Sequence, residues 1–181
     1  FAHLRKRHYQ EAIGSLEQAK KLAKADSNFM SDVSNMLGDA YNATKAFEKS
    51  DKAFDEALAL NPGNNSALNN YSYYLALRKT NLEKAEKMSS QLTKNSPDNP
   101  TFLVTYAWVL YTREKYKEAR KVIERAITTG NANATHFEHY GDILFKLGDV
   151  NGGVDQWQKA RGMNANSESL NKKIANRKMY E

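Results

Sequence analysis

The side chains best suited to chemistry gather in the stretch THFEHYGD, residues 135–142, which contains His136, Glu138, His139 and Asp142. His139 and Asp142 are three residues apart, so a helix would place them on one face, where an imidazole and a carboxylate can bind a metal. The stretch lacks the two histidines four residues apart, with an adjacent glutamate, that helical zinc sites of metalloproteases use. We therefore expect no metal site, and we interpret both histidines as ordinary surface or interface residues.

Other catalytic arrangements are also missing from the sequence. The chain has no cysteine, which excludes disulfides, cysteine-based zinc sites and a catalytic thiol. The glycine-rich segment GDVNGG, residues 148–153, is not followed by Lys-Ser/Thr and is therefore not a phosphate-binding loop. No Gly-x-Ser-x-Gly motif occurs, and no nucleophile is paired with a base. These observations predict a protein that is not an enzyme and that uses no cofactor and no small-molecule substrate.

Aromatic side chains concentrate in the segment 101–127, which contains neither glycine nor proline. Tyr106 falls in a column of bulky residues that recurs along the chain, so we expect it to pack in the core. Trp108 and Tyr111 lie two and five residues further on, and Tyr73 is the equivalent of Trp108 one unit earlier. These three aromatics have two interpretations: they face a binding groove, or they pack on a neighbouring helix.

The chain repeats one pattern of bulky and small residues, with a period of 34 residues that becomes 35 in the second unit. The bulky column contains Leu37, Tyr71, Tyr106 and Tyr140. Small residues follow it at Gly38, Ser72, Ala107 and Gly141, and a second small column contains Ser50, Ala85, Ala119 and Gly153. Each unit shows apolar residues at helical spacing twice, around a short polar turn, which predicts two antiparallel helices. One hairpin cannot bury both of its faces, so stacked neighbours must complete the core.

This period and this pattern resemble the tetratricopeptide repeat over almost the whole chain. The resemblance implies an all-α fold, namely a right-handed α-solenoid of antiparallel helix hairpins. We expect a single solenoid over residues 1–181 with the following parts: a partial repeat over 1–30, full repeats over 31–64, 65–99, 100–133 and 134–167, and a capping helix over 168–181.

The first thirty residues match the later part of a unit. The second-helix columns of this segment contain Ala12, Leu16 and Ala19. We therefore expect residue 1 to lie inside the first helix of a repeat whose beginning is upstream, which would leave Leu4, Ile13 and Leu16 without their usual cover.

The last segment of the chain has the features of a capping helix. Ser167 is a predicted N-cap, and Leu170 and Ile174 fall on one helical face with the charges elsewhere. This helix is expected to cover the last exposed apolar face of the stack.

In the tetratricopeptide fold the first helix of each repeat lines a concave groove, so the resemblance implies which side chains face a partner. The groove candidates are Asn35, Asp39, Asn69, Tyr73, Trp108, Tyr111, Glu138 and Asp142. Family members that capture the C-terminal carboxylate of chaperones use lysines, an arginine and asparagines in the groove. Asn70 matches one such asparagine, whereas other residues stand at the remaining positions: Asn35, Asp39, Thr101 and Thr105. We therefore do not expect carboxylate capture.

The net charge of +6 raises the question of a nucleic-acid partner. Lysines and arginines fall mainly on turns and second helices, where glutamates four residues away can pair with them. The groove positions instead carry acids near both ends: Asp32, Asp39, Glu138 and Asp142. A phosphate backbone needs a continuous basic track, so we expect no nucleic-acid partner.

These observations predict a protein-interaction scaffold that binds a peptide or helix of a partner protein in its groove. The alternative is a self-assembling or structural segment of a larger protein, in which an exposed end repeat or a groove packs against another copy. The repeat sequences, such as NNYSYYLALR and EHYGDILFKLGD, resemble those of long bacterial tetratricopeptide proteins. Many of those are exported or anchored at the cell envelope, so the resemblance implies an envelope or periplasmic location, which no feature of the chain itself specifies.

Overall fold

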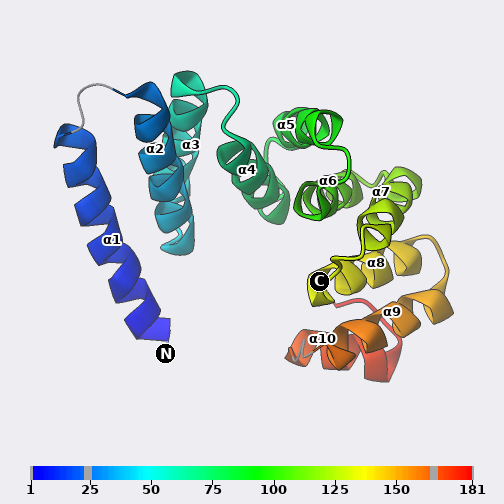
Figure 1. Cartoon of the computed structure of the whole chain (residues 1–181). Coiled ribbons are helices and arrows are strands. Elements are labelled where there is room, and N and C mark those ends of the chain that lie inside the picture. Colours follow the sequence, from blue (N-terminus) through cyan, green and yellow to red (C-terminus); the bar gives the residue numbers. More distant parts are fainter. Residues whose placement is uncertain (1, 23–25, 164–166, 181) are drawn as a thin grey trace. The chain divides into compact units, whose positions relative to one another are not determined.

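Ten α-helices make up the part of the chain that the structure describes, and no strand occurs in that part. The structure is a computed structural model that describes residues 2–22, 26–163 and 167–180, and within the first helix the side chains of residues 8–21. The helices, drawn in Figure 1, are α1 (Ala2–Leu22), α2 (Ser27–Ala43), α3 (Phe47–Leu60), α4 (Asn65–Leu77), α5 (Leu82–Asn95), α6 (Pro100–Thr112), α7 (Tyr116–Thr128), α8 (Ala134–Lys146), α9 (Val150–Gly162) and α10 (Glu168–Asn176). None of the described helices has both the length and the apolar character that crossing a membrane requires.

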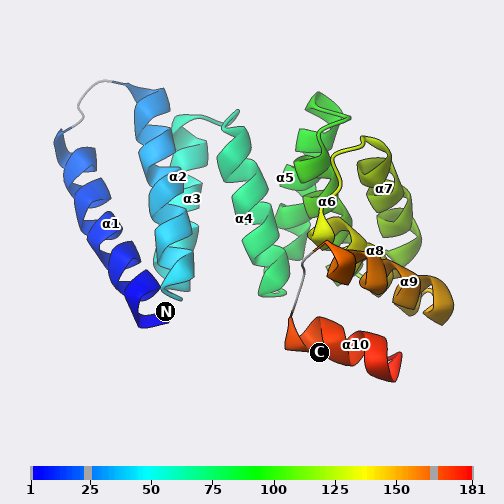
Figure 2. The ribbon, with the colours of Figure 1, turned by 60° about the horizontal axis from the view of Figure 1, so that its bottom comes forward.

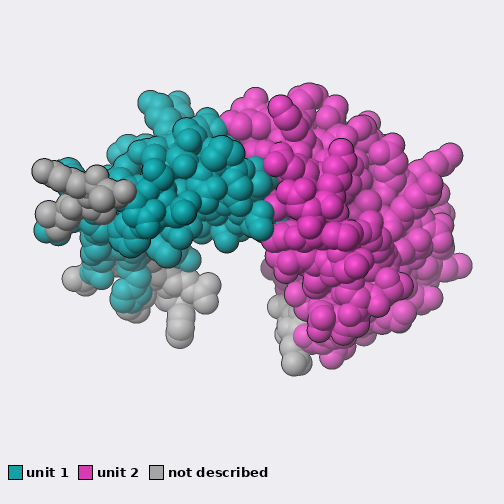
Figure 3. All heavy atoms as spheres, turned by 45° about the horizontal axis from the view of Figure 1, so that its top comes forward, with its two compact units in different colours: residues 1–74 teal, residues 75–181 magenta. Residues whose placement is uncertain are grey.

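The chain forms two compact units, Phe1–Tyr74 and Leu75–Glu181, which Figure 3 shows in different colours. In the first unit, α1 lies alongside α2, as Figure 2 shows, and α2 packs on α3. In the second unit, α6 packs on α5 and α7, and α8 packs on α7 and α9. The division between the units falls within α4, so it does not coincide with any of the repeat boundaries expected from the sequence.

Several helices begin at residues whose side chains cap exposed backbone N–H groups. Asn99 accepts hydrogen bonds from two N–H groups at the start of α6, and Pro100 follows at a position where no N–H is needed. Asn133 caps α8 in the same way, and its own N–H donates to His136 Nδ1 at 3.3 Å. These caps fix where the first helices of two hairpins start, and hence which residues face the core.

The turn inside each hairpin contains at least one residue with a left-handed backbone. The φ angle is 63° at Lys45, 54° at Lys79 and 46° at Asn81 in one turn, 61° at Glu114 and 89° at Gly148. Only the last of these is a glycine, the residue that adopts this conformation without steric cost. In the other three turns a side chain is held in a conformation that costs roughly 1–2 kcal/mol.

The small columns bring the two helices of a hairpin close together, as the sequence predicted. A Cβ atom at Gly38 would lie 2.7 Å from the ring of Phe54, and one at Gly141 would lie 2.4 Å from Trp157 Cδ1. Ser50 is buried, and its hydroxyl donates to the Gly38 carbonyl at 2.8 Å. The large aromatic side chain of the second helix therefore occupies the space that a side chain on the first helix would need.

The N-terminal helix differs from the expected arrangement. One continuous helix runs from Ala2 to Leu22, so its beginning does not form a separate first helix. Ile13 and Leu16 pack against the core of the first unit, which contains Val33, Leu37 and Ala53. The side chain of Leu4 lies outside the described residues, so the structure does not test its expected exposure.

The C-terminal helix α10 begins where the sequence predicted a capping helix over 168–181, but it ends at Asn176. Ser167 accepts a hydrogen bond from the Leu170 N–H at 3.0 Å, and the C-cap residue Arg177, with a φ angle of 49°, follows the last helical residue. Leu170 is fully buried against Trp157, and Ile174 packs on the same cluster. The prediction that the charges point away from this face is wrong, because Lys173 is buried among them with only 5% of its surface exposed.

Candidate protein-binding surfaces

Charges are distributed unequally between the two helices of the hairpins. The sequences of α4 and α6 contain no charged residue, whereas α5 carries lysine and glutamate and α7 carries lysine, arginine and glutamate. In the second unit, Arg113 and Lys115 both bind Glu86, each at 2.8 Å. A partner that contacts α4 and α6 therefore meets mainly uncharged and aromatic side chains.

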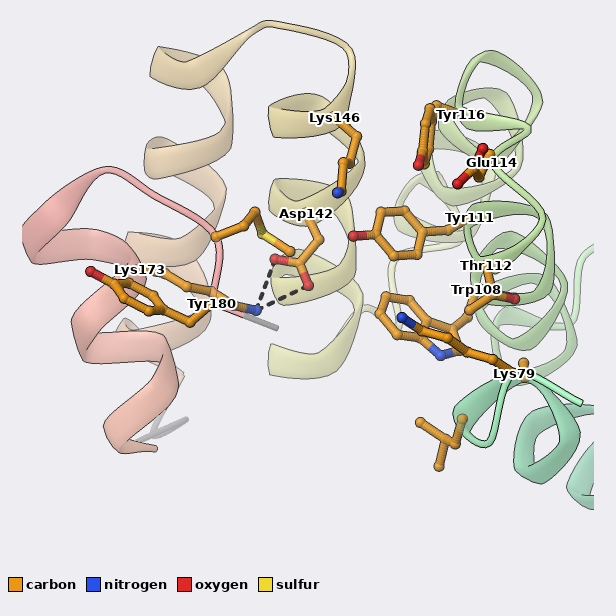
Figure 4. Close-up of a pocket in the computed structure, with 13 residues that line it drawn as sticks. Lys79, Trp108, Tyr111, Thr112, Glu114, Tyr116, Asp142, Lys146, Lys173 and Tyr180 are labelled. Atoms are coloured by element: carbon orange, nitrogen blue, oxygen red, sulfur yellow. Dashed lines mark hydrogen bonds and ion pairs between the residues drawn. The ribbon is translucent and has the colours of Figure 1, made fainter.

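The second unit contains a pocket of about 360 Å³ on its first helices. Figure 4 shows the lining residues, which come from the end of α4 and the turn after it, from α6 and the start of α7, from α8, and from α10 and the segment after it. They are Ala76, Leu77, Lys79, Trp108, Tyr111, Thr112, Glu114, Tyr116, Asp142, Lys146, Lys173, Met179 and Tyr180. Three of the groove candidates therefore line one pocket: Trp108, Tyr111 and Asp142.

Trp108 is the centre of an aromatic stack in this pocket. Its ring stacks on Tyr111 with the ring centroids 4.7 Å apart, and on His139 of α8 with the centroids 4.0 Å apart. The ring of Tyr111 is in turn tilted by 59° to the ring of Tyr116, with the ring centroids 5.5 Å apart. The two interpretations of Trp108 are therefore compatible: the ring packs on a neighbouring helix and still lines a pocket. Its Nε1 atom is buried without a hydrogen-bond partner among the described residues.

A buried ion cluster lies at one side of the pocket. Lys173 Nζ is 2.9 and 3.0 Å from the two carboxylate oxygens of Asp142, as Figure 4 shows, and 3.2 Å from Glu138 Oε1. Trp157 Nε1 donates to Asp142 Oδ1 at 2.8 Å, so this carboxylate has both a charged and a neutral donor within the second unit. Both groove candidates on α8, Glu138 and Asp142, are thus engaged by α10, and Asp142 has only 3% of its surface exposed.

Burial dominates the electrostatics of this cluster. It raises the pKa of Asp142 above its ordinary value, although Lys173 and Trp157 act in the opposite direction. Burial also lowers the pKa of His139 to about 3, helped by the nearby positive charge of Lys173. His139 is therefore neutral at physiological pH and contributes a flat, uncharged face to the aromatic stack.

The histidine–carboxylate stretch has a structural role in the fold. His136 accepts the hydrogen bond of the capping box at the start of α8, and His139 is covered by Trp108. Burial lowers the pKa of His136 as well. In the described ranges, no three histidine, aspartate or glutamate side chains lie close enough together to hold a metal ion.

The groove candidates of the first unit lie on α2 and α4. Asn35 is buried, with 8% of its surface exposed, and Asp39 accepts hydrogen bonds from Asn70 Nδ2 at 3.1 and 3.2 Å. Asn69 Nδ2 donates to Asn70 Oδ1 at 3.3 Å, and the Tyr73 ring lies 6.2 Å from that of Tyr74. The structure thus joins Asp39 to the asparagine pair and leaves Asn35 covered.

Several residues of these surfaces were not anticipated from the sequence. They include His139 as a stacking partner, Lys173 as a buried cation, and Lys79, Met179 and Tyr180 as pocket residues. Lys173 had a detectable signal, because it is three residues after Leu170 and therefore falls on the apolar face of α10. The stacking of His139 had no signal, because it depends on the packing of two helices that are distant in sequence.

Solved structures of other proteins share this fold. PilW, a type IV pilus biogenesis factor, has a TM-score of 0.81 at 16% identity, over 97% of this chain and 80% of its own. PilF of Pseudomonas aeruginosa has a TM-score of 0.73 at 17% identity, over 84% of this chain and 69% of its own. A tetratricopeptide repeat protein from Parabacteroides merdae has a TM-score of 0.71 at 18% identity, over 97% of this chain and 69% of its own. No curated protein matches the sequence.

The sequence itself carries the family pattern. The profile of the tetratricopeptide repeat matches residues 2–65 and 73–135, which is more than half of the chain. The hairpin of α8 and α9 lies almost entirely beyond this match, yet Gly141 and Gly153 provide a close approach like that of Gly38 in the hairpin of α2 and α3. The chain therefore belongs to the tetratricopeptide repeat family, and its fold is the all-α solenoid of antiparallel hairpins that the sequence predicted.

Proposed function

We propose that the protein is a scaffold that binds a peptide or helix of another protein on its first helices, with the pocket beside Trp108 and Tyr111 as the main anchor. The family to which the chain belongs consists of protein-interaction scaffolds that are generally not catalytic. The observation that carries the proposal is the stacked pair of aromatic rings, only partly buried, in a pocket of about 360 Å³.

The chemistry of the pocket favours contacts based on shape and aromatic rings. Trp and Tyr are enriched among the residues that dominate binding energy at interfaces, because they bury a large area with little loss of side-chain freedom. Lys79 and Lys146 on the rim are balanced in part by Glu114, so the rim favours no strongly charged ligand. An apolar or aromatic side chain of the partner is expected to enter between the rim residues.

Site-specific photo-crosslinking tests this proposal. A photoreactive residue is placed at Leu77, which is half exposed on the pocket rim, and in a control at Lys121, which is exposed on α7. A cell extract of the source organism is irradiated with each protein, and the cross-linked species is identified. We expect a partner protein that cross-links from Leu77 and does not cross-link from Lys121.

The partner so identified is then purified, and its affinity is measured against variants. Trp108→Ala should weaken binding about 30-fold or more, which corresponds to the roughly 2 kcal/mol of an interface hot spot. Leu77→Ser should also weaken binding, and because Leu77 is half exposed it should leave the melting temperature unchanged. Lys121→Ala is the matched control and should bind like the unaltered protein.

Two results would reject the proposal. Equal affinity of the Trp108→Ala, Leu77→Ser and control variants would show that the pocket is not the anchor. Cross-linking from Leu77 to a second copy of this chain alone would show that the surface mediates self-association, with no separate partner protein.

A further inference from the structure

The first helices of the first unit carry a charge opposite to that of the whole chain. Within Ser27–Ala43 and residues 65–74 the only ionisable groups with a charge at neutral pH are Asp32 and Asp39. The chain as a whole has a net charge of +6. An acidic surface on a basic protein repels phosphate backbones and anionic lipid headgroups, and it attracts cationic groups.

Neither carboxylate is neutralised by a cation among the described residues. Asp32 accepts a hydrogen bond from Asn64 Nδ2 at 2.9 Å, and Asp39 accepts from Asn70 Nδ2. The hydroxyl of Tyr74 also donates to Asp39. These donors are neutral amides and a phenol, so they hold the carboxylates in place without cancelling their charge.

Two apolar side chains alternate with these acids along α2. Phe29 and Met36 have 49% and 52% of their surface exposed, so about half of each apolar side chain is available for contact. Residues 29, 32, 36 and 39 follow helical spacing and therefore share one face of α2. We call Phe29, Asp32, Met36 and Asp39 the α2 stripe; at 1.5 Å per residue it is about 15 Å long.

We propose that the α2 stripe binds a cationic amphipathic helix of a partner protein, with lysine or arginine side chains opposite the two aspartates and apolar side chains beside Phe29 and Met36. This inference rests on the proposed scaffold function and adds a second docking surface with a defined partner chemistry. Two apolar residues of the partner helix one heptad apart match the seven-residue spacing from Phe29 to Met36.

The structure favours a helix as the occupant over other cationic ligands. Phe29 and Met36 offer apolar contact that a small cation or a fully charged peptide cannot use. Hydrogen bonds from Asn64 and Asn70 hold the two aspartate carboxylates in place, so their negative charges lie at defined positions along α2. A helix with one apolar stripe flanked by basic residues satisfies both requirements at once.

The first experiment measures fluorescence anisotropy of two labelled synthetic peptides with this protein. One is a 15-residue helix former with leucine on one face and lysine on the flanks, and the other has glutamate in place of each lysine. Because the chain is positively charged overall, long-range attraction favours the glutamate peptide. Saturable binding of the lysine peptide alone, weaker at higher salt, would therefore report a local acidic surface.

Variants assign this binding to the stripe. The double variant Asp32→Asn/Asp39→Asn keeps the side-chain shape and should weaken binding of the lysine peptide at least tenfold. Met36→Ser should weaken it several-fold, and its melting temperature should stay unchanged because the side chain is half exposed. Glu48→Gln on α3 is the matched control for loss of a carboxylate, and it should alter the affinity less than twofold.

Several outcomes would overturn the inference. One is equal binding of both peptides, and another is equal affinity of the double variant and the control. A third is a concentration-dependent dimer, detected by light scattering, that Met36→Ser abolishes, because then a second copy covers the stripe.

The failure of this inference can be told apart from failure of the proposed function. If the lysine peptide does not bind but Trp108→Ala abolishes binding of the cross-linked partner, only the inference about the α2 stripe is wrong. If the α2 stripe binds the lysine peptide as stated and Trp108→Ala has no effect on binding of the partner, the pocket is not the anchor, and the inference about the α2 stripe still holds.

Discussion

Replacement of Lys173 by methionine should release α10 from the last hairpin. The change removes the ammonium that contacts Asp142 at 2.9 and 3.0 Å and Glu138 at 3.2 Å, while the hydrocarbon part of the side chain is retained. Asp142 would remain buried with Trp157 Nε1 as its remaining hydrogen-bond donor among the described residues. Removing one member of a buried ion pair costs roughly 3–5 kcal/mol.

We expect a loss near the lower end of this range, about 3 kcal/mol, because Trp157 still compensates part of the charge. Repeats of this kind unfold in parts, so a single melting temperature does not measure the loss well. Hydrogen exchange of the amides in α9 and α10 measures it directly, and a loss of this size corresponds to exchange that is about a hundred times faster. Lys172→Met is the matched control, since Lys172 pairs with Glu168 on the surface, and it should change exchange little.

The effect should depend on pH in a defined direction. Burial raises the folded-state pKa of Asp142 above 3.8, so protonation stabilises the fold below that value, and this stabilisation is lost as the pH rises through the folded pKa. Lys173 opposes the rise, so removing it shifts the folded pKa further upward. The difference between Lys173→Met and the unaltered protein should therefore be largest near neutral pH and shrink as the pH falls toward about 4.

A second substitution provides the internal check. Asp142→Asn in the Lys173→Met background removes the unpaired charge and keeps an acceptor for Trp157, so it should recover most of the lost protection. The reasoning is refuted if Lys173→Met accelerates exchange less than tenfold, or if its effect is the same at pH 4 and pH 7.

Four further substitutions test the packing and the turns. Ala119→Glu buries a carboxylate without a partner in the core of the second unit, and loss of helical circular dichroism should show a cost of several kcal/mol. Gly141→Ala forces a methyl group into Trp157, and denaturant titration should show a loss of about 1–3 kcal/mol. Glu114→Gly relieves the left-handed turn and should raise stability by about 0.5–1 kcal/mol, whereas Gly148→Ala should lower it by about as much. The stability changes of Glu114→Gly and Gly148→Ala should have opposite signs. Changes of the same sign would show that the left-handed backbone conformation does not control the stability of these two turns.

The hairpin architecture could be predicted from the sequence because it depends on spacing within about 34 residues. The small columns identified, from spacing alone, where the two helices of a hairpin approach closely, as Gly38 does with Phe54 and Gly141 with Trp157. The cap at Ser167 was equally local, since a serine oxygen needs only the backbone three residues ahead. Such features depend on the pattern alone, and the structure confirms them.

The details of the surfaces could not be predicted in the same way. The burial of Lys173 depends on an aspartate 31 residues earlier in the chain, and without that partner a lysine at this position would be expected in solvent. The left-handed turns at Lys45, Lys79 and Glu114 carry no glycine to mark them. The continuous α1 was missed because its first residues resemble the end of a first helix, and no helix-breaking residue separates them from the rest of α1. In each case tertiary packing outweighs local preference.

The pairing of Lys173 with Asp142 also sets a rule for building longer arrays from this hairpin. Asp142 lies on α8, the first helix of its hairpin, but its cationic partner Lys173 lies on α10, outside that hairpin. The hairpin by itself therefore contains a buried carboxylate whose cation comes from the next helix. If α10 is exchanged for another repeat, the incoming helix must bring a cation to the position of Lys173, or Asp142 must be replaced at the same time. A generic repeat joined without this charge would leave the junction as the weakest point of the array, and unfolding would begin there.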